Sequence, residues 1–536
     1  MSTLPARPYP FRPLGLYDAL VSDGAPAGAC SILQNLVHDI TTPLVWIGRP
    51  AAELISNFAN FNSPGDVSVM LAIGTRVFGM IGTQRFAGKD EPFCFDTATN
   101  LFSGILNISA AAQLPATQPS TGPWTPPTMA VVGSKIIVTH PGFAGTGNFI
   151  GIIDIATITA PTWSAGNTTV QGLPSIPLAV AQFDNRAWYA CANRAYYSDA
   201  LAPDVITNAT QFVTLGSTGS NVLAFSGLPI SQTQGGVLAA LLGFKDEGYW
   251  QILPDATVTY ALNGPFKPGT RAPRSVVQTP TGVFYVTDAG VRVIGPDGTP
   301  SPAPLPGVRS PFASAREISR VAACYNDTVY RVGLQTITNP LSGQIQYCEY
   351  WYDFEVNQFT GPHIPLSSSI MVGVDNTFVV ATIGQPGKLF RSDAHGNLIP
   401  SVLEFGQAMQ VRLQSVLLSQ DDNMSTKTLV ESQIDVGFGS ANSTLSAEWL
   451  SATDGAVGSA TITAVVGTYW NQFNWNEADW SAAQYGLRTY NIDWDQPVVY
   501  KSGAFSLYGT LTPNLRIGPA RFRTQLTNQQ NTQNPP

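Results

Sequence analysis

Stretches in which apolar and polar residues alternate recur along the chain between residues 66 and 400. Each unit begins with a short apolar segment, passes a turn containing Gly, Asn or Asp, and continues with a second alternating segment. This two-residue period is typical of β-strands joined by tight turns, and Gly290 and Gly387 stand at two of the turns. Seven such units begin at Val67, Pro127, Pro177, Gly236, Pro273, Ile318 and Ser369.

The unit starts lie roughly 40–60 residues apart, which brackets the length of a four-stranded blade in propeller repeats. We therefore predict an all-β protein with a β-propeller of about seven blades over residues 66–401. Six or eight blades fit the same spacing almost as well. Because the repeat is degenerate, an irregular pair of β-sandwiches stays open as the alternative.

Two segments flank the predicted propeller. Residues 1–65 start with a proline-rich arm and become partly apolar, whereas residues 402–525 contain long alternating segments such as AMQVRLQSVLLSQ. We predict that the C-terminal region forms an antiparallel β-sandwich platform together with the N-terminal segment. Residues 526–536 are almost entirely polar and end in two prolines, so we expect a disordered tail there.

The charge of the chain is low and acidic. Charged residues make up 12% of the sequence and the net charge is −8, whereas about 25% charged residues is typical of soluble proteins. A nucleic-acid-binding protein needs a clustered basic face, which this composition argues against. Few charges also suit a surface that meets other protein.

The cysteines and the apolar runs exclude further classes. The five cysteines are scattered and form no CxxC pair, so we expect free buried thiols in place of a disulfide framework or a zinc site. The longest apolar runs are far shorter than the ~20 residues of a membrane span. The N-terminus has no apolar signal-peptide segment, and we expect no membrane insertion.

Motifs for enzyme chemistry are missing from the sequence. The four histidines, His38, His140, His363 and His395, form no HxH or HExxH pattern. There is no G-x-S-x-G elbow and no phosphate-binding loop followed by a helix. We therefore expect no catalytic, cofactor or metal site, and a protein that is not an enzyme.

A tryptophan-rich stretch near the C-terminus, YWNQFNWNEADW from Tyr469, needs a separate argument. Glu477 and Asp479 would share one face of a strand about 7 Å apart, and a glycosidase uses two carboxyl groups at such separations. No second acidic motif accompanies them, and large aromatic residues are enriched in interface hot spots. We therefore predict assembly contacts at Trp470, Trp475, Trp480, Trp494 and Arg516.

Four segments share a likeness to one family. They are ILQNLVHDITTPLVWIGRPAAE from Ile32, RAYYSDALAPD from Arg194, the tryptophan-rich stretch, and GAFSLYGTLTPNLRIGPARFR from Gly503. In this order they resemble the tail nozzle (tail-tube hub) proteins of short-tailed bacteriophages and the related head-completion proteins that stabilise packaged DNA. Arg516 stands in the recurring R-I-G position of the closing segment.

The resemblance implies a structural virion protein that forms a six-membered ring below the portal and adaptor. It implies that viral DNA passes the lumen without specific binding, which an acidic lumen poor in Lys and Arg would favour. Implied partners are further copies of the chain, the adaptor or portal, and tail fibre or tail tip proteins. The implied location is the virion, after assembly in the bacterial host cytoplasm.

A second class of function remains as the alternative. A carbohydrate-binding or depolymerising propeller would recognise host surface polysaccharide with aromatic residues repeated from blade to blade. The tryptophans of this chain concentrate instead near the C-terminus, which favours the structural virion protein.

Overall fold

The protein is built almost entirely of β-strands. In the described part of the chain there are 44 strands, one four-residue helix and four 3-10 turns, and no helix there has the length and apolar character of a membrane span. The computed structural model describes residues 7–12, 14–17, 28–42, 44–57, 65–83, 85–108, 110–118, 125–144, 146–217, 219–233, 236–255, 259–315, 317–326, 328–339, 344–364, 366, 368–382, 385–393, 402–418, 425–439, 443–464 and 487–526.

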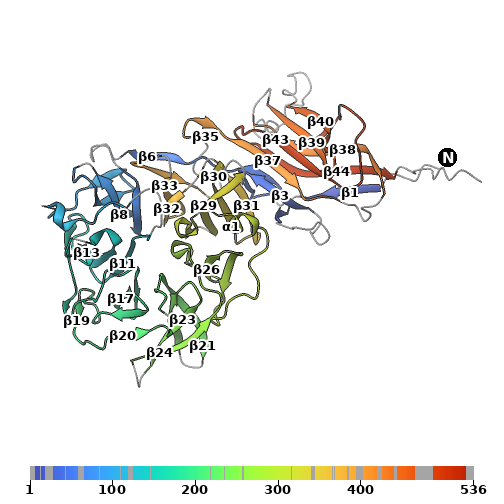
Figure 1. Ribbon diagram of the computed structural model, residues 1–536. Helices are drawn as coiled ribbons and strands as arrows, with labels where there is room; N and C mark the ends of the chain where they lie inside the picture. The colour runs from blue at the N-terminus through green and yellow to red at the C-terminus, as the bar shows by residue number, and fades with distance from the viewer. Residues whose placement is uncertain are drawn as a thin grey trace, which may run out of the picture.

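A β-propeller occupies the middle of the chain (Figure 1). Its innermost strands form a closed ring in which each contacts the next and the last contacts the first: β7 (Val67–Ile73), β11 (Thr128–Val132), β16 (Val180–Phe183), β21 (Ala224–Thr233), β25 (Val277–Thr279), β28 (Ala322–Asn326) and β32 (Ser368–Val374). Six of these strands belong to separate sheets, and β28 belongs to the largest sheet of the molecule. The predicted propeller is confirmed, with six separate blades and one further position filled by the large sheet.

The other blade strands follow outward in chain order. The first three blades continue with β8 (Arg76–Thr83), β9 (Lys89–Asp96) and β10 (Leu101–Ser103); β12 (Lys135–Thr139), β13 (Ile150–Asp154) and β14 (Thr162–Gly166); and β17 (Arg186–Cys191), β18 (Arg194–Tyr197) and β20 (Phe212–Thr214). The next three continue with β22 (Gly236–Phe244), β23 (Tyr249–Asp255) and β24 (Thr259–Phe266); β26 (Gly282–Thr287) and β27 (Gly290–Ile294); and β33 (Thr377–Thr382) and β34 (Lys388–Ser392).

Short elements lie in the connections between the propeller strands. They are β15 (Thr169–Val170) paired with β19 (Val205–Ile206), the helix α1 (Ser310–Ala313), and the 3-10 turns η2 (Ala111–Gln113), η3 (Pro141–Phe143), η4 (Pro273–Ser275) and η5 (Ile318–Arg320).

The polar residues between alternating segments do form the tight turns of the blades. Asp184 and Asn185 join β16 to β17 with φ angles of 52° and 56°. Two positive φ angles in a two-residue turn match the right-handed twist of the paired strands, and Asn and Asp tolerate them best among non-glycine residues. Gly290 and Gly387 also have positive φ angles.

The ring closes with help from outside residues 66–401. Strand β6 (Glu53–Asn57) pairs antiparallel with β34 and forms the outer strand of the last blade, so the segment 1–65 contributes to the propeller as well as to the platform. The Arg274 side chain of η4 donates hydrogen bonds to the carbonyl oxygens of Ser369, at 3.0 Å, and of Ser68. Arg274 thereby links the fifth blade to both blades that meet at the closure.

The platform is a sandwich of two sheets. One sheet contains β1 (Arg7–Phe11), β4 (Leu36–His38), β5 (Trp46–Gly48), β38 (Lys427–Gly437), β41 (Arg488–Asn491), β42 (Val499–Tyr500) and β44 (Arg516–Leu526). The other contains β2 (Gly15–Leu16), β3 (Ala29–Gln34), β37 (Gln410–Ser415), β43 (Gly503–Thr510), β39 (Thr444–Ser451) and β40 (Gly455–Thr463). The predicted platform of N-terminal and C-terminal segments is confirmed. Of the predicted tail, Leu526 ends β44 and residues 527–536 lie outside the described residues.

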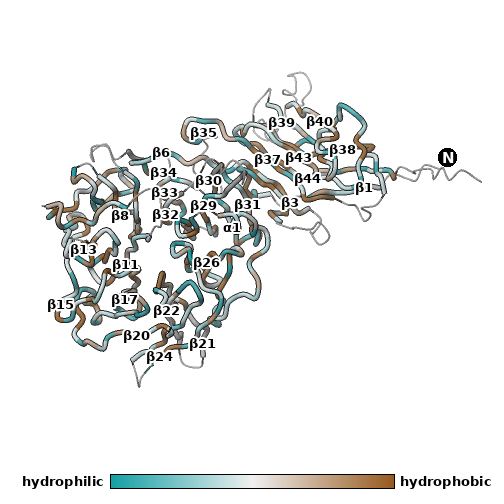
Figure 2. Tube along the Cα trace, in the orientation of Figure 1, coloured by the Kyte–Doolittle hydropathy of each residue, from teal (hydrophilic) through white to brown (hydrophobic). Residues whose placement is uncertain are grey.

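The second platform sheet continues into the propeller. From β3 it passes to β31 (Gln358–His363), β30 (Gln344–Asp353), β29 (Val329–Asn339) and β28, which makes ten strands in all. Figure 2 shows hydrophobic positions recurring along these strands and through the platform. One hydrophobic core includes Tyr330 and Phe359 on the propeller side and Phe11, Trp449 and Phe505 in the platform. Propeller and platform therefore share a sheet and a core.

Candidate functional site

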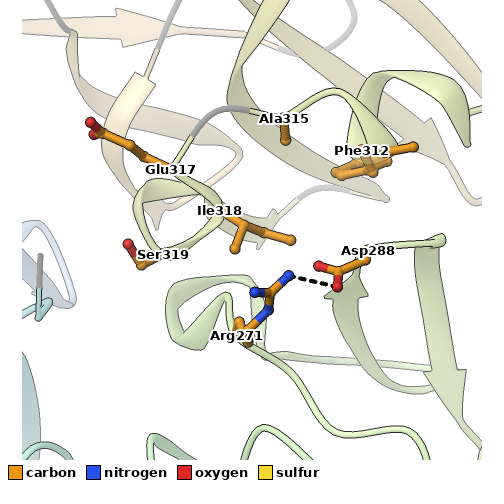
Figure 3. Close-up of a pocket in the computed structure, with 8 residues that line it drawn as sticks. Arg271, Asp288, Phe312, Ala315, Glu317, Ile318 and Ser319 are labelled. Carbon is orange, nitrogen blue, oxygen red and sulfur yellow. Dashed lines mark hydrogen bonds and ion pairs between the residues drawn. The ribbon is translucent and has the colours of Figure 1, made fainter. Parts of the chain in front are cut away.

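An open pocket is lined by residues from three loop regions of the propeller (Figure 3). Its volume is ≈ 830 Å³, within the range of about 300–1,000 Å³ that small-molecule sites usually have. Arg271 comes from the connection between β24 and β25, and Asp288 from the turn between β26 and β27. The other lining residues lie in and after α1 and are Phe312, Ala313, Ala315, Glu317, Ile318 and Ser319.

The charged groups of the pocket are arranged in pairs. Arg271 lies 2.6 Å from Asp288 and 3.8 Å from Asp246, and all three side chains are about half exposed or more. The hydrogen bond that Arg271 donates to Asp288 raises the pKa of Arg271 above its ordinary value. On the other wall, Glu317 lies 2.6 Å from Arg320. The Arg271 pairs are exposed and contribute little to stability. The Glu317–Arg320 pair is partly buried, with 25% and 18% of the two side chains accessible.

The apolar part of the pocket is its floor. Phe312 is buried, and Ile318 is half-buried beside it. Because both lining carboxylates, Asp288 and Glu317, already bind arginines, the lining presents no poised acid and base pair.

A second polar cluster lies at the seam between propeller and platform. We call it the seam network, and it consists of Asn35, Arg49, Arg331, Glu349, Trp351, His363 and Glu404. Arg49, which follows β5, binds Glu404 through both carboxylate oxygens, with Nη1 at 2.9 Å from Oε1. Glu404 lies in the hairpin of β35 (Leu403–Glu404) and β36 (Gln407–Ala408). Both side chains are fully buried.

The other half of the seam network comes from the propeller side. Glu349 accepts hydrogen bonds from Arg331 Nε at 2.9 Å, from Arg331 Nη2 at 2.7 Å and from Trp351 Nε1 at 2.7 Å. The His363 ring packs on Trp351 with centroids 4.4 Å apart. Burial, followed by the positive charges of Arg49 and Arg331, lowers the pKa of His363 well below 6.5. The network is closed to substrates because these side chains are buried.

One buried Asp–His pair deserves comparison with catalytic pairs. His140 Nδ1 accepts a hydrogen bond from Gly142 N at 3.0 Å, so Nε2 carries the proton and donates to Asp90, 3.0 Å away. Burial raises the pKa of Asp90, but hydrogen bonds from His140 and Thr117 outweigh burial and lower it. Both ring nitrogens are engaged, so the pair has no nitrogen left to activate a nucleophile. Its role is to hold the first two blades together.

Some of the residues predicted from the sequence lie outside the described part of the chain. Trp470, Trp475, Trp480, Glu477 and Asp479 lie outside the described residues. Within the described part of the chain, no three His, Cys, Asp or Glu side chains are grouped so as to hold a metal ion.

Trp494 and Arg516 are described, and both lie in the platform. Trp494 is half-buried, its Nε1 donates to Ser432 Oγ at 2.9 Å, and its ring lies 6.3 Å from that of Trp449. Arg516 binds Asp39 at 2.8 Å and joins β44 to the turn between β4 and β5. Their contact with another copy of the chain stays a prediction.

The sequence pattern predicted neither the pocket nor the seam network. Arg271 and Asp288 are paired across two connections, and neither stands in a motif. The seam offered one signal, since Asn35 and Arg49 both belong to the segment from Ile32 that carries the family resemblance.

Comparison with known proteins gives little beyond the fold. No model of a known family matches the chain, and no curated protein matches it. Among solved structures, a puromycin-hydrolysing peptidase of Mycobacterium tuberculosis is 11% identical with a TM-score of 0.38, over 68% of this chain and 61% of that one. The WD40 β-propeller domain of Doa1 is 9% identical with a TM-score of 0.28, over 64% of this chain and 96% of that domain.

A third similar structure is the β-propeller domain of the Trilobed protease from Pyrococcus furiosus. It is 11% identical with a TM-score of 0.35, over 62% of this chain and 94% of that domain. At such identities the similarity concerns the fold alone. The activities of these proteins are therefore not carried over, and the propeller assignment here rests on the strand order itself.

Proposed function

We propose that this protein is a structural component of the tail of a short-tailed bacteriophage, one copy of a nozzle ring that forms the DNA-ejection channel below the portal and adaptor. The observation that carries the proposal is the ten-stranded sheet that runs from the platform into the propeller. A ring subunit has to keep its ring-forming part and its outward part at a fixed angle. A shared sheet and a shared core provide that rigidity.

The placement of the resembling segments supports the proposal. The segment from Ile32 supplies part of β3, then β4, β5 and the start of β6, and the segment from Gly503 supplies β43 and most of β44. These strands build the platform and its seam with the propeller. These two segments of the likeness therefore fall on parts that would set the geometry of a ring. The segment from Arg194 lies in the third blade, and the tryptophan-rich stretch lies outside the described residues.

Native mass spectrometry of tails isolated from virions tests the ring. Six copies of the chain per ring are expected, together with the adaptor or portal and the tail fibre or tail tip proteins. Cryo-electron microscopy of the same tails would place the propellers around the channel. A single copy of the chain in intact tails would overturn the proposal.

The open pocket favours a second candidate function, recognition of host surface polysaccharide. Hydroxyl groups of a sugar fit the paired charges of Arg271 and Asp288, with the apolar floor beneath them. Calorimetric titration with purified host polysaccharide would separate the two functions. Sugar binding that disappears in Asp288→Ala, but persists in the distant Asp297→Ala control, would support this candidate.

A further inference from the structure

His363 occupies an unusual place in the seam network. It ends β31, the strand through which the propeller meets the platform, and its side chain is fully buried. Nε2 lies 3.0 Å from Thr360 Oγ1, which satisfies one ring nitrogen. Nδ1 has no hydrogen-bond partner among the described residues. A buried polar atom in this state is uncommon and calls for a physical explanation.

The charges around His363 balance only while its ring is neutral. Arg49 faces it from the segment after β5 and Arg331 faces it from β29. Glu404 of the β35 hairpin neutralises Arg49, and Glu349 of β30 neutralises Arg331. A proton on His363 would add a third cation to two buried ion pairs. No described carboxylate of the network is left to pair with it.

The hydrogen bonds around His363 also favour a neutral ring. Arg331 Nη1 is a buried donor that has no acceptor within the described residues. A protonated Nδ1 of His363 would become a second buried donor of this kind. A buried donor without an acceptor costs about 1–3 kcal/mol, and more when it is charged.

Few backbone pairs join β31 of the propeller to β3 of the platform. Strands β31 and β3 are joined in register at one pair, Leu33 and Gly361. The Asn35 side chain adds a bridge, because its Oδ1 accepts from Ile364 N at 2.9 Å and its Nδ2 donates to Ile364 O at 2.6 Å. A local opening at this joint would hydrate His363 without unfolding any separate blade.

We propose that the seam is an acid-sensitive joint, in which uptake of a proton by His363 separates β31 from β3 while the separate blades stay folded. The closed state holds the pKa of His363 below 6.5, and the opened state restores the ordinary value. The opened state therefore binds the proton more readily. The stability of the closed joint is fully present above pH 6.5 and is lost as the pH falls below that value.

Hydrogen–deuterium exchange measured by mass spectrometry on the full chain tests the proposal. Between pH 7.5 and pH 5.0, after correction for the intrinsic pH dependence of exchange, peptides covering residues 29–36 and 344–364 should lose about 30-fold in protection. Peptides from the first blade, residues 67–103, should change much less. Equal changes in the seam and in the first blade would overturn the proposal.

Two variants identify the residue. His363→Gln keeps a hydrogen-bonding group near Thr360 but takes up no proton, so its seam peptides should show no acid response. Thr360→Val is the matched control, because it removes the hydrogen bond and leaves the titrating ring in place. An acid response that persists in His363→Gln would overturn the proposal.

A measurement on the unmodified chain covers the case in which His363→Gln does not fold. Nuclear magnetic resonance of ring-labelled histidine should show one ring that stays neutral until the seam peptides open. If every histidine ring titrates near its ordinary pKa while the seam stays closed, the proposal is wrong.

Discussion

Single residues decide how charge is tolerated inside this protein. Charged residues are scarce, at 12% of the sequence, yet Arg49–Glu404 and Arg331–Glu349 are ion pairs whose side chains are fully buried. Desolvation of two buried charges costs several kcal/mol per ion, and only good geometry with further hydrogen bonds offsets that cost. Both pairs have such bonds. Arg49 donates to Asn35 Oδ1 and Glu404 accepts from the backbone N–H of Ala52. In the other pair Glu349 accepts from Trp351.

Replacing one partner of a buried ion pair should lower the free energy of unfolding more than replacing both partners. Glu404→Leu leaves the Arg49 guanidinium buried without its carboxylate, so we expect a loss of about 3–5 kcal/mol in the free energy of unfolding. The double variant Arg49→Met with Glu404→Leu should lose clearly less. Urea denaturation followed by tryptophan fluorescence measures both.

The exposed pair of Arg523 and Glu431, with 53% and 42% of the two side chains accessible, is the matched control. Replacing both of these residues by alanine should change the free energy of unfolding by less than about 1 kcal/mol. A double variant of the buried pair as unstable as Glu404→Leu alone would contradict the argument.

At the scale of strands, the last blade depends on an outer strand, β6, that comes from outside residues 66–401. Four residues of β6 stand in register with β34, from Lys388↔Asn57 to Arg391↔Glu53. The strand lies at a sheet edge and comes from a segment distant in sequence. The last blade therefore gains its outer strand only when the N-terminal segment reaches it.

Leu54→Pro should detach β6 from β34. Proline lacks the backbone N–H and distorts the strand, and losing four cross-strand pairs should cost roughly 1–4 kcal/mol. We expect faster hydrogen exchange over residues 377–392 and a lower melting temperature. Because Leu54 is 47% exposed, Leu54→Thr should leave both nearly unchanged, and equal effects of the two variants would refute the role of pairing.

The strands also show what a local pattern can predict. Six of the seven units found in the sequence begin within a few residues of the start of an innermost strand, because alternation and turn residues are local properties. The fourth begins at Gly236, on β22. In the fourth unit the innermost strand, β21, was missed. Its sequence AFSGLPISQT contains Gly, Pro and Ser residues that resemble a loop.

Strand partners distant in sequence left no trace in that pattern. The continuation of the platform sheet into β31 rests on the pairing of Leu33 with Gly361. The pocket likewise depends on Arg271 meeting Asp288 across two loops. Such contacts follow from the closed fold, and residue spacing alone cannot specify them.

For the whole molecule, a rigid junction between platform and propeller and a low content of cationic side chains both suit the proposed channel. The shared sheet fixes the platform to the propeller, and the net charge of −8 leaves the surface without an excess of cations. A conduit has to let DNA pass without holding it. Too few cations means that little counterion would be released on contact with DNA.

The chain should therefore not bind duplex DNA under ordinary conditions. In a gel-shift titration at ~0.15 M salt, micromolar protein should give no complex, since specific and non-specific binding both draw on phosphate neutralisation. Repeating the titration at ~0.05 M salt controls for weak electrostatic contact. A salt-resistant complex would argue against a passive channel.

The interlacing of the two ends of the chain also constrains how the protein is made. Strand β1 pairs with β44, and β3 pairs with β37, so strands synthesised first find their partners last. At ~5–20 residues per second, β1 waits roughly 25–100 s for β44 to leave the ribosome. The strand Ala29–Gln34 pairs with β31 and β37, so it cannot join its sheet until those strands have been synthesised. A prematurely terminated product would keep that segment exposed to proteases, so the topology itself distinguishes finished chains from unfinished ones.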